Sequence, residues 1–155
     1  MKKTRHALTT EIPKDQEWVS YPQFEKELYK KDVHFPDVKP ITDGPQSHWF
    51  GYYDKFATDP EDWFILGMEV GFDDRSPTKD DFISVGMVDI EDNNKWTHLG
   101  ESCAWCWQQG CMLQWRPGST GEVMWNDRSG CRFVCHIVNV KTGNRRTLDF
   151  PVYDT

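Results

Sequence analysis

The sequence predicts an all-β chain of two four-stranded antiparallel sheets, preceded by an irregular N-terminal arm. Two observations lead to this prediction. From Ile41 onward, short apolar runs rich in aromatic and β-branched residues alternate with polar turn clusters, and none keeps a helical period. The second observation is a repeat with an offset of about 50 residues, because the segment 87–99 (MVDIEDNNKWTHL) resembles the segment 137–148 (IVNVKTGNRRTL).

The repeat also suggests how the two sheets are used. A four-stranded unit that recurs at roughly 40–50 residues is typical of the blades of a β-propeller, since one such sheet cannot bury both of its faces alone. Two blades cannot close a propeller. We therefore expect the chain to be the N-terminal piece of a longer propeller, and assembly with copies of itself is the alternative.

Residues 1–40 form the expected arm, which is rich in Lys and poor in apolar residues. One short helix is predicted over residues 20–31, because Ser20 and Gln23 have capping-box spacing. We expect the rest of the arm to be irregular and to lie over another surface.

The two sheets are predicted over residues 41–102 and 103–150, with residues 151–155 as the start of a third. Each predicted strand is an apolar run between two polar turns. In chain order, the predicted strands are 48–57, 63–70, 82–90 and 95–101 in the first sheet, and 105–115, 122–127, 131–140 and 145–150 in the second.

Four segments between Ile41 and Thr155 resemble the first blades of bacterial β-propellers that are grouped with TolB-like and oligogalacturonate-lyase-like proteins. They are ITDGPQSHWFGYYDK (41–55), DPEDWFILGMEV (59–70), CWQQGCMLQWRPGSTGEVMWND (106–127) and HIVNVKTGNRRTL (136–148). The resemblance implies a propeller fold whose ligand site lies at one mouth of the central channel. The metal ligands of those lyases come from later blades, so it implies no cofactor in this chain and a divalent cation in the full-length protein.

The stretch HWFGYYDK, residues 48–55, supplies the first candidate site residues. On a strand, alternate side chains share a face, so His48, Tyr52 and Asp54 are predicted to face a ligand at the channel mouth. Asp54 is expected to fix the tautomer of the His48 imidazole. Trp49 and Phe50 are expected to pack between blades, and packing is also the alternative interpretation of the whole stretch.

The second unit supplies the other ligand-binding candidates, which are Trp105, Gln108, Gln109, Asp127 and Arg128. The two glutamines either form a wet, polar mouth or hold loops together, because buried amides must be hydrogen-bonded. The segment 125–130 is interpreted mainly as a hairpin turn in which the side chains of Asn126 and Asp127 bond to their own backbone.

The cysteines and the acidic loop are interpreted without a metal. Five cysteines and no apolar signal segment favour reduced thiols and a cytoplasmic chain if Met1 is the true start. A four-thiolate zinc site from Cys103, Cys106, Cys131 and Cys135 is the alternative. The loop 71–81 is expected to be solvated, and His136 is expected to be a satisfied core or channel histidine.

Charge and composition limit the function. The net charge of -7 and the absence of a basic cluster argue against a nucleic-acid partner, and no apolar run is long enough to span a membrane. The main hypothesis is a carbohydrate-related propeller fragment from a polyuronide-lyase-like protein. The alternatives are a non-catalytic TolB-like propeller that binds protein or envelope components, and a purely structural fragment. No catalytic residue is assigned, and whether the chain belongs to an enzyme stays open.

Overall fold

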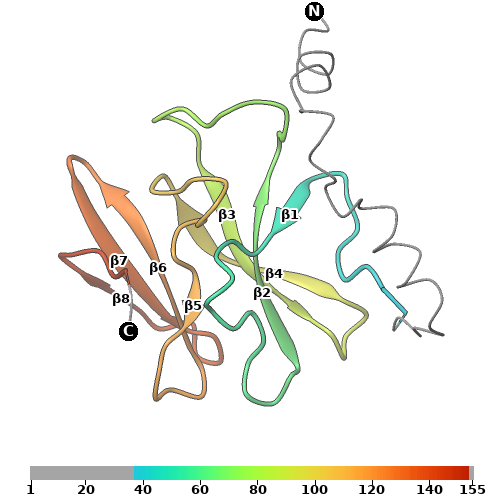
Figure 1. The fold of residues 1–155 in the computed structure, drawn as a ribbon. Coiled ribbons are helices and arrows are strands. Elements are labelled where there is room, and N and C mark those ends of the chain that lie inside the picture. Colours follow the sequence, from blue (N-terminus) through green and yellow to red (C-terminus); the bar gives the residue numbers. More distant parts are fainter. Residues whose placement is uncertain (1–36, 154–155) are drawn as a thin grey trace, which may run out of the picture. The chain divides into compact units, whose positions relative to one another are not determined.

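The computed structural model describes residues 37–153 of the chain (Figure 1). These residues contain no helix and form two four-stranded antiparallel sheets, so the predicted all-β fold class is confirmed. Both sheets belong to one compact unit that begins at Pro40. The helix predicted over residues 20–31 lies outside the described residues, as does most of the predicted arm.

Each sheet is a meander in which successive strands pair with one another. Sheet 1 contains β1 (Ser47–Trp49), β2 (Phe64–Val70), β3 (Ile83–Asp89) and β4 (Lys95–Ser102). Sheet 2 contains β5 (Gln114–Trp115), β6 (Glu122–Ser129), β7 (Arg132–Asn139) and β8 (Arg145–Leu148). The three longer strands of each sheet lie where the apolar runs predicted them.

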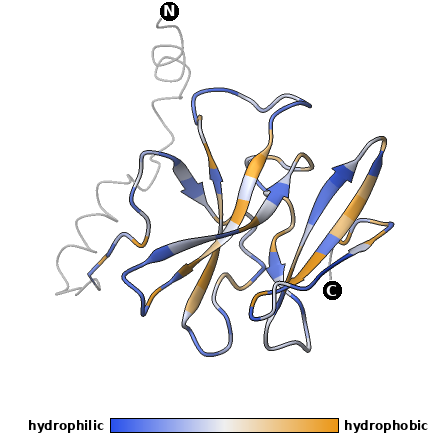
Figure 2. Cartoon of the chain, turned by 180° about the vertical axis from the view of Figure 1, so that it is seen from behind, coloured by the Kyte–Doolittle hydropathy of each residue, from blue (hydrophilic) through white to orange (hydrophobic). Residues whose placement is uncertain are grey.

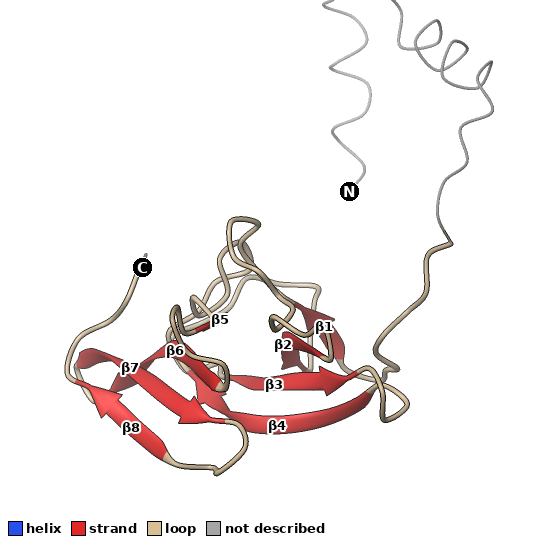
Figure 3. Cartoon of the chain, turned by 90° about the horizontal axis from the view of Figure 1, so that it is seen from below, coloured by secondary structure: helices blue, strands red, loops and turns tan. Residues whose placement is uncertain are grey.

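The sequence repeat corresponds to the hairpins β3–β4 and β7–β8 (Figure 3). Asp89 ends β3, and its Oδ1 accepts hydrogen bonds from the backbone N–H groups two and three residues further on, each at 3.1 Å. Asn139 lies 50 residues later at the end of β7, and its Oδ1 accepts the corresponding two bonds at 3.1 and 2.9 Å. Short side chains of this kind close turns by bonding to nearby backbone. The two units therefore share turn chemistry as well as apolar pattern.

The main core lies between the two sheets. Leu66 and Met68 of β2 and Val85 of β3 are buried in one cluster with Val123 and Trp125 of β6. Figure 2 shows hydrophobic stretches along strands of both sheets, whereas most of the connecting loops are hydrophilic. We call the face that each sheet turns toward the other its proximal face, and the opposite face its distal face.

The distal face of sheet 2 carries a second, smaller core. Met124, Cys135 and Ile137 are buried there, and the partly buried side chains of Leu148 and Val152 pack against them. The Asn126 amide bonds to the backbone of Val152 in both directions, since its Oδ1 accepts from the Val152 N–H at 2.8 Å and its Nδ2 donates to the Val152 carbonyl at 2.7 Å. This pair of bonds fixes residues after β8 against sheet 2.

The first strand of each sheet is much shorter than predicted. The predicted strand 48–57 ends at Trp49, and Gly51 has a φ of 115°, which lies outside the extended region. In the predicted strand 105–115, Gly110 (φ 60°) and Met112 (φ 58°) adopt left-handed conformations, and only Gln114 and Trp115 are extended in a sheet. Most of each stretch is loop. The tryptophans in these loops pack against the main core, whereas Tyr53 and Phe56 are exposed, so aromatic content does not report strand geometry here.

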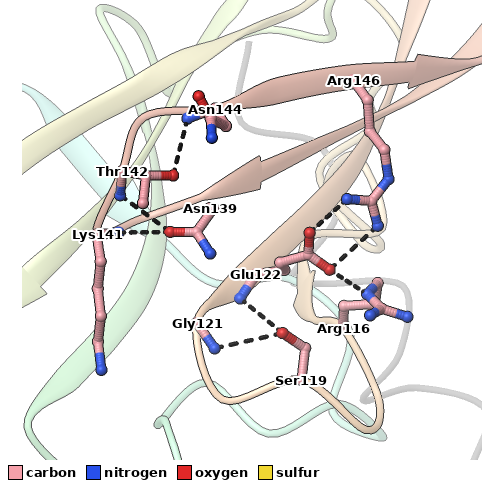
Figure 4. A network of polar contacts seen from close by, with 9 residues as sticks. All are labelled: Arg116, Ser119, Gly121, Glu122, Asn139, Lys141, Thr142, Asn144 and Arg146. Carbon is pink, nitrogen blue, oxygen red and sulfur yellow. Dashed lines mark hydrogen bonds and ion pairs between the residues drawn. The ribbon is translucent and has the colours of Figure 1, made fainter.

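A polar network joins the strands of sheet 2 on its distal face (Figure 4). The Glu122 carboxylate accepts a hydrogen bond from Arg116 Nε at 2.5 Å and is bridged by both terminal nitrogens of Arg146, one of them at 3.1 Å. The Glu122 side chain is 13 % exposed, whereas the two arginines are 39 % and 52 % exposed. The hydrogen bond from Arg146 is the main cause that lowers the pKa of Glu122 to about 2.

This network predicts a loss of stability in acid. Because the folded-state pKa of Glu122 is depressed, its contribution is present above the ordinary pKa of 4.5 and is lost as pH falls toward about 2. Glu122→Gln is expected to be less stable than the parent at neutral pH, and the difference should shrink through this window. Urea unfolding between pH 7 and pH 2 measures it. Asp92→Asn, which removes a single exposed ion pair with Lys95, is the control, and an unchanged difference at pH 2 would contradict the prediction.

Candidate ligand-binding site

A cavity of about 520 Å³ opens beside the end of β6. Its walls come from the β2–β3 loop (residues 77–79), the β4–β5 loop, β6, the start of β7 and the segment after β8. Three of the predicted site residues line it, namely Trp105, Gln109 and Arg128. Arg128 lies 23 positions after Trp105 and 19 positions after Gln109, so the cavity is a product of the fold.

Trp105 forms part of a cluster of aromatic rings. Its centroid lies 5.6 Å from that of Trp49 and 5.1 Å from that of Trp107, and its indole Nε1 donates to the carbonyl of Asp81 at 3.0 Å. The indole of Trp107 donates in the same way to the carbonyl of Arg75. Trp105 lines the cavity, and the contacts with the other two rings hold it in place. Trp49 and Phe50 pack against the main core, as the sequence predicts.

The loop 71–81 is mostly exposed, as predicted, and several contacts fix its conformation. Arg75 bonds to the Asp81 carboxylate through two nitrogens, at 2.7 and 2.8 Å, and its guanidinium lies 3.6 Å from the Phe72 ring centroid. The hydrogen bond with Arg75 is the main cause that lowers the pKa of Asp81. Together with the two indole bonds from Trp105 and Trp107, these contacts place residues 77–79 against the cavity.

Gln109 joins two of the cavity walls. Its Nε2 donates to the hydroxyl oxygen of Tyr153 at 3.2 Å, so it holds the β4–β5 loop to the segment after β8. Gln108 is exposed on the same loop and is not part of the lining. Of the two alternatives for the glutamines, the bond of Gln109 to Tyr153 supports the one in which they hold loops together. Gln109 also lines the cavity, and the wet, polar mouth stays a prediction.

Asp127 does not line the cavity, but it bonds to the backbone of Cys103, which does. Its Oδ1 accepts from the backbone N–H of Cys103 at 2.8 Å, and its Oδ2 lies 3.1 Å from Nε2 of His136. The other ring nitrogen of His136 lies 2.9 Å from the Thr147 hydroxyl, so both nitrogens are satisfied, as predicted. The prediction that Asn126 and Asp127 bond to their own backbone is wrong: both lie within β6, and their side chains bond to other segments.

Charge in the cavity has one sign. The charged side chains that line it are Lys79 and Arg128, and no lining residue is a carboxylate. Arg128 also donates to the Lys79 carbonyl, which ties β6 to the β2–β3 loop. The lining also includes the amide of Asn126 and the aromatic rings of Phe133 and Tyr153.

The other predicted site residues lie elsewhere. His48 is on the distal face of sheet 1, where its Nε2 lies 3.1 Å from the Glu69 carboxylate and its ring contacts Trp96 edge-on. The predicted pairing of His48 with Asp54 is wrong, because the strand ends at Trp49 and Asp54 instead pairs with Lys55 at 3.5 Å. Asp54 lines a different cavity, of about 810 Å³, between the β1–β2 and β5–β6 loops.

Tyr52 lies near the edge of the site. Its ring centroid is 4.6 Å from that of Tyr53, and a hydrogen bond with Tyr53 is the main cause that raises the pKa of the Tyr52 phenol. The neighbouring Tyr153, which lines the cavity, raises it further. Tyr52 is thus placed beside the cavity wall and not on a strand shared with His48.

Several lining residues were missed by the sequence analysis, above all Lys79, Phe133 and Tyr153. Lys79 lies in the loop interpreted as solvated, and nothing in the local pattern distinguishes it from other charged loop residues. Phe133 and Tyr153 are large aromatic residues that stay more than half exposed, at 55 % and 65 %. Their residue type alone does not distinguish them from the aromatic residues of the core.

The five cysteines are free thiols. Burial raises the pKa of Cys111 and Cys135, and of the half-buried Cys103, so these thiols stay protonated near neutral pH. Cys131 lies in the β6–β7 turn and not on a strand with Cys135. Among residues 37–153, no group of three or more His, Cys, Asp or Glu side chains is placed to hold a metal ion.

Comparison with protein-family models, with curated proteins and with solved structures finds no match for this chain. In the part of the chain that the structure describes, no helix is long and apolar enough to cross a membrane. The function is therefore inferred from the chemistry of the cavity and from the arrangement of the two sheets.

Proposed function

We propose that residues 41–153 form two blades of a propeller-type assembly and that the cavity beside β6 binds an acidic carbohydrate, as a polyuronide-binding or lyase-like protein does. The observation that carries the ligand class is the lining of the cavity. It combines the cations Lys79 and Arg128 with the rings of Phe133 and Tyr153 and with the amide of Gln109.

Each part of this lining matches one part of an acidic sugar. Guanidinium groups form strong, charge-assisted hydrogen bonds with carboxylates. Aromatic faces suit the apolar C–H surface of a sugar ring, while amide groups bond to its hydroxyls. The absence of a lining carboxylate favours an anion locally, although the chain as a whole has a net charge of -7.

The blade interpretation is supported by the repeated sheets. Two meanders of the same strand order pack through one shared core, and their outer hairpins use the same turn chemistry at positions 50 residues apart. This is the stacking that a four-stranded sheet needs in order to bury both faces. Further blades, either of a longer protein or of another copy of the chain, are the proposed partners that continue the stack.

Titration calorimetry with a short oligogalacturonate and with a neutral glucan of equal length tests the ligand class. We expect the acidic oligomer to bind more tightly, with an affinity that falls as salt rises. Arg128→Met is expected to weaken binding by at least about tenfold, because it removes a charge-assisted hydrogen bond.

Two further variants make this test specific. Lys79→Met removes the second cation from an 81 % exposed side chain, so it separates loss of charge from loss of the Arg128 contact with the loop. Arg132→Met removes an exposed arginine that does not line the cavity and should leave affinity unchanged. Equal affinity for the neutral glucan, or an Arg128→Met variant that binds normally, would contradict the proposal.

A second candidate function is binding of a protein or envelope component by a non-catalytic, TolB-like propeller. It is favoured by the exposed aromatic side chains at the cavity and on the segment after β8, which are Phe133, Phe150 and Tyr153. Exposed rings of this size are enriched at protein interfaces. Failure of every carbohydrate titration, together with loss of partner binding on Phe150→Ser, would favour this second function.

A further inference from the structure

The two proximal faces already pack against each other, and each distal face resembles the proximal face of the other sheet. Ile83, Val85 and Met87 on the proximal face of β3 correspond, 50 residues later, to Phe133, Cys135 and Ile137 on the distal face of β7. Sheet 1 buries Ile83 completely against sheet 2, whereas the corresponding Phe133 is 55 % exposed. Cys135 and Ile137 are already buried, with Leu148 and Val152 packed against them, so Phe133 is the exposed part of this repeated surface. The distal face of sheet 2 therefore repeats the apolar pattern that sheet 2 itself covers on sheet 1.

The distal face of sheet 1 in turn resembles the proximal face of sheet 2. Val88 on this face corresponds to Val138, which belongs to the core between the sheets. The distal face of sheet 1 also carries an imidazole–carboxylate pair, His48 with Glu69 at 3.1 Å. The proximal face of sheet 2 carries a similar pair, His136 with Asp127 at 3.1 Å, and in both places a tryptophan ring meets the imidazole edge-on.

Charge on the two distal faces is complementary. On sheet 2, Arg116, Arg128 and Arg146 share this face with one carboxylate, Glu122. On sheet 1, a hollow of about 320 Å³ has three carboxylates among its lining residues, which are Glu69, Asp80 and Asp81, and it also contains the exposed ring of Phe82. These carboxylates also pair within the chain, with His48, Lys79 and Arg75 respectively. Stacking of a second copy would therefore bring a face with three arginines and a protruding aromatic ring against a hollow lined by three carboxylates.

We propose that a second copy of this chain docks head to tail, with the distal face of its sheet 2 against the distal face of sheet 1 of the first copy. The contact continues the stacking seen within the chain, because each face meets the counterpart of its present neighbour. Such a contact joins two different surfaces, so it leaves one face open at each end and extends to a ring or a filament.

Sedimentation of the full chain at increasing concentration, combined with two face-specific variants, tests the proposal. Phe82→Lys blocks the sheet 1 face, because it places a cation opposite the arginines, and Phe133→Asp blocks the sheet 2 face, because it places a carboxylate opposite the acidic hollow. Both side chains are more than half exposed, which protects the fold. We expect the parent chain to self-associate and each variant alone to remain monomeric. An equimolar mixture of the two variants should form a dimer and stop there, since each of its remaining outer faces carries a blocking charge.

The mixture distinguishes head-to-tail docking from a symmetric dimer. A dimer of two sheet 2 faces would form from Phe82→Lys alone, and a dimer of two sheet 1 faces from Phe133→Asp alone; either result overturns the proposal. A parent chain or mixture that stays monomeric up to its solubility limit overturns it as well. Phe56→Asp, at an 85 % exposed ring in the β1–β2 loop, is the matched control and should associate like the parent. Phe82→Ser and Phe133→Ser replace the charged variants if circular dichroism shows that they unfold.

Discussion

Trp125→Ala is expected to lower the free energy of unfolding by roughly 3–5 kcal/mol, because it deletes the largest buried side chain at the junction of the two sheets. Trp125 is 0 % exposed, and its indole Nε1 donates to the Glu101 carbonyl of sheet 1 at 3.0 Å. A Cβ on Gly100 would lie 2.7 Å from its ring, so the glycine allows this close approach. The substitution leaves a cavity and an unpaired carbonyl at the same place.

Chemical unfolding followed by circular dichroism measures this loss. Trp63→Ala is the matched control, since it removes the same side chain type from a position that is 57 % exposed, and it should change stability by less than about 1 kcal/mol. Similar losses for the two variants would show that Trp125 does not join the sheets in the way described. In that case the two sheets would be expected to unfold independently.

The sequence was sufficient to predict the strands whose side chains alternate between two environments. In β2, β3, β6 and β7, apolar side chains fill the core, and glycines or polar turns interrupt the runs at the ends. The repeat was also recoverable, because Asp89 and Asn139 close equivalent turns with the same acceptor chemistry. Both features depend on local pattern, which a single sequence displays directly.

The sequence was misleading where aromatic residues pack without being extended. The runs 48–57 and 105–115 contain the residue types that favour strands, yet most of each run is loop. Trp49, Trp105 and Trp107 gather in one cluster because loops from both sheets meet there. Residue type reports burial in this case, and only the positive φ of Gly51 and Gly110 shows that the chain turns.

The candidate site was predicted in part for the same reason. Trp105, Gln109 and Arg128 were selected by residue type, and the fold brings them to one cavity. His48 was placed there by strand alternation that does not extend past Trp49, so its partner is Glu69 on the neighbouring strand. Lys79 lines the cavity because Trp105, Trp107 and Arg128 hold its loop through backbone carbonyls, and no local pattern contains such contacts between distant segments.

Gly86→Ala is expected to destabilise the chain by roughly 1–3 kcal/mol or more, through a clash that the backbone cannot avoid. A Cβ at this position would lie 2.4 Å from the Trp96 ring and 2.6 Å from the Thr97 carbonyl oxygen on β4. The pairing of β3 with β4 shifts register between Val85 and Gly86, so the strands approach closely there. Relief would require β4 to move, which would disturb the edge of sheet 1.

Gly67→Ala is the matched control for this prediction. A Cβ on Gly67 would meet the same ring, but its nearest atom is Trp96 Cζ3 at 3.3 Å, and no backbone atom lies closer than 3.8 Å. A small tilt of the indole can accommodate that contact, so Gly67→Ala should lose much less stability in urea unfolding. The double variant Gly86→Ala with Trp96→Ala removes the ring but keeps the Thr97 carbonyl in place. Its alanine at position 86 should therefore still be destabilising relative to Trp96→Ala alone, and full relief by the double variant would show that the ring, and not the backbone of β4, requires a glycine at this position.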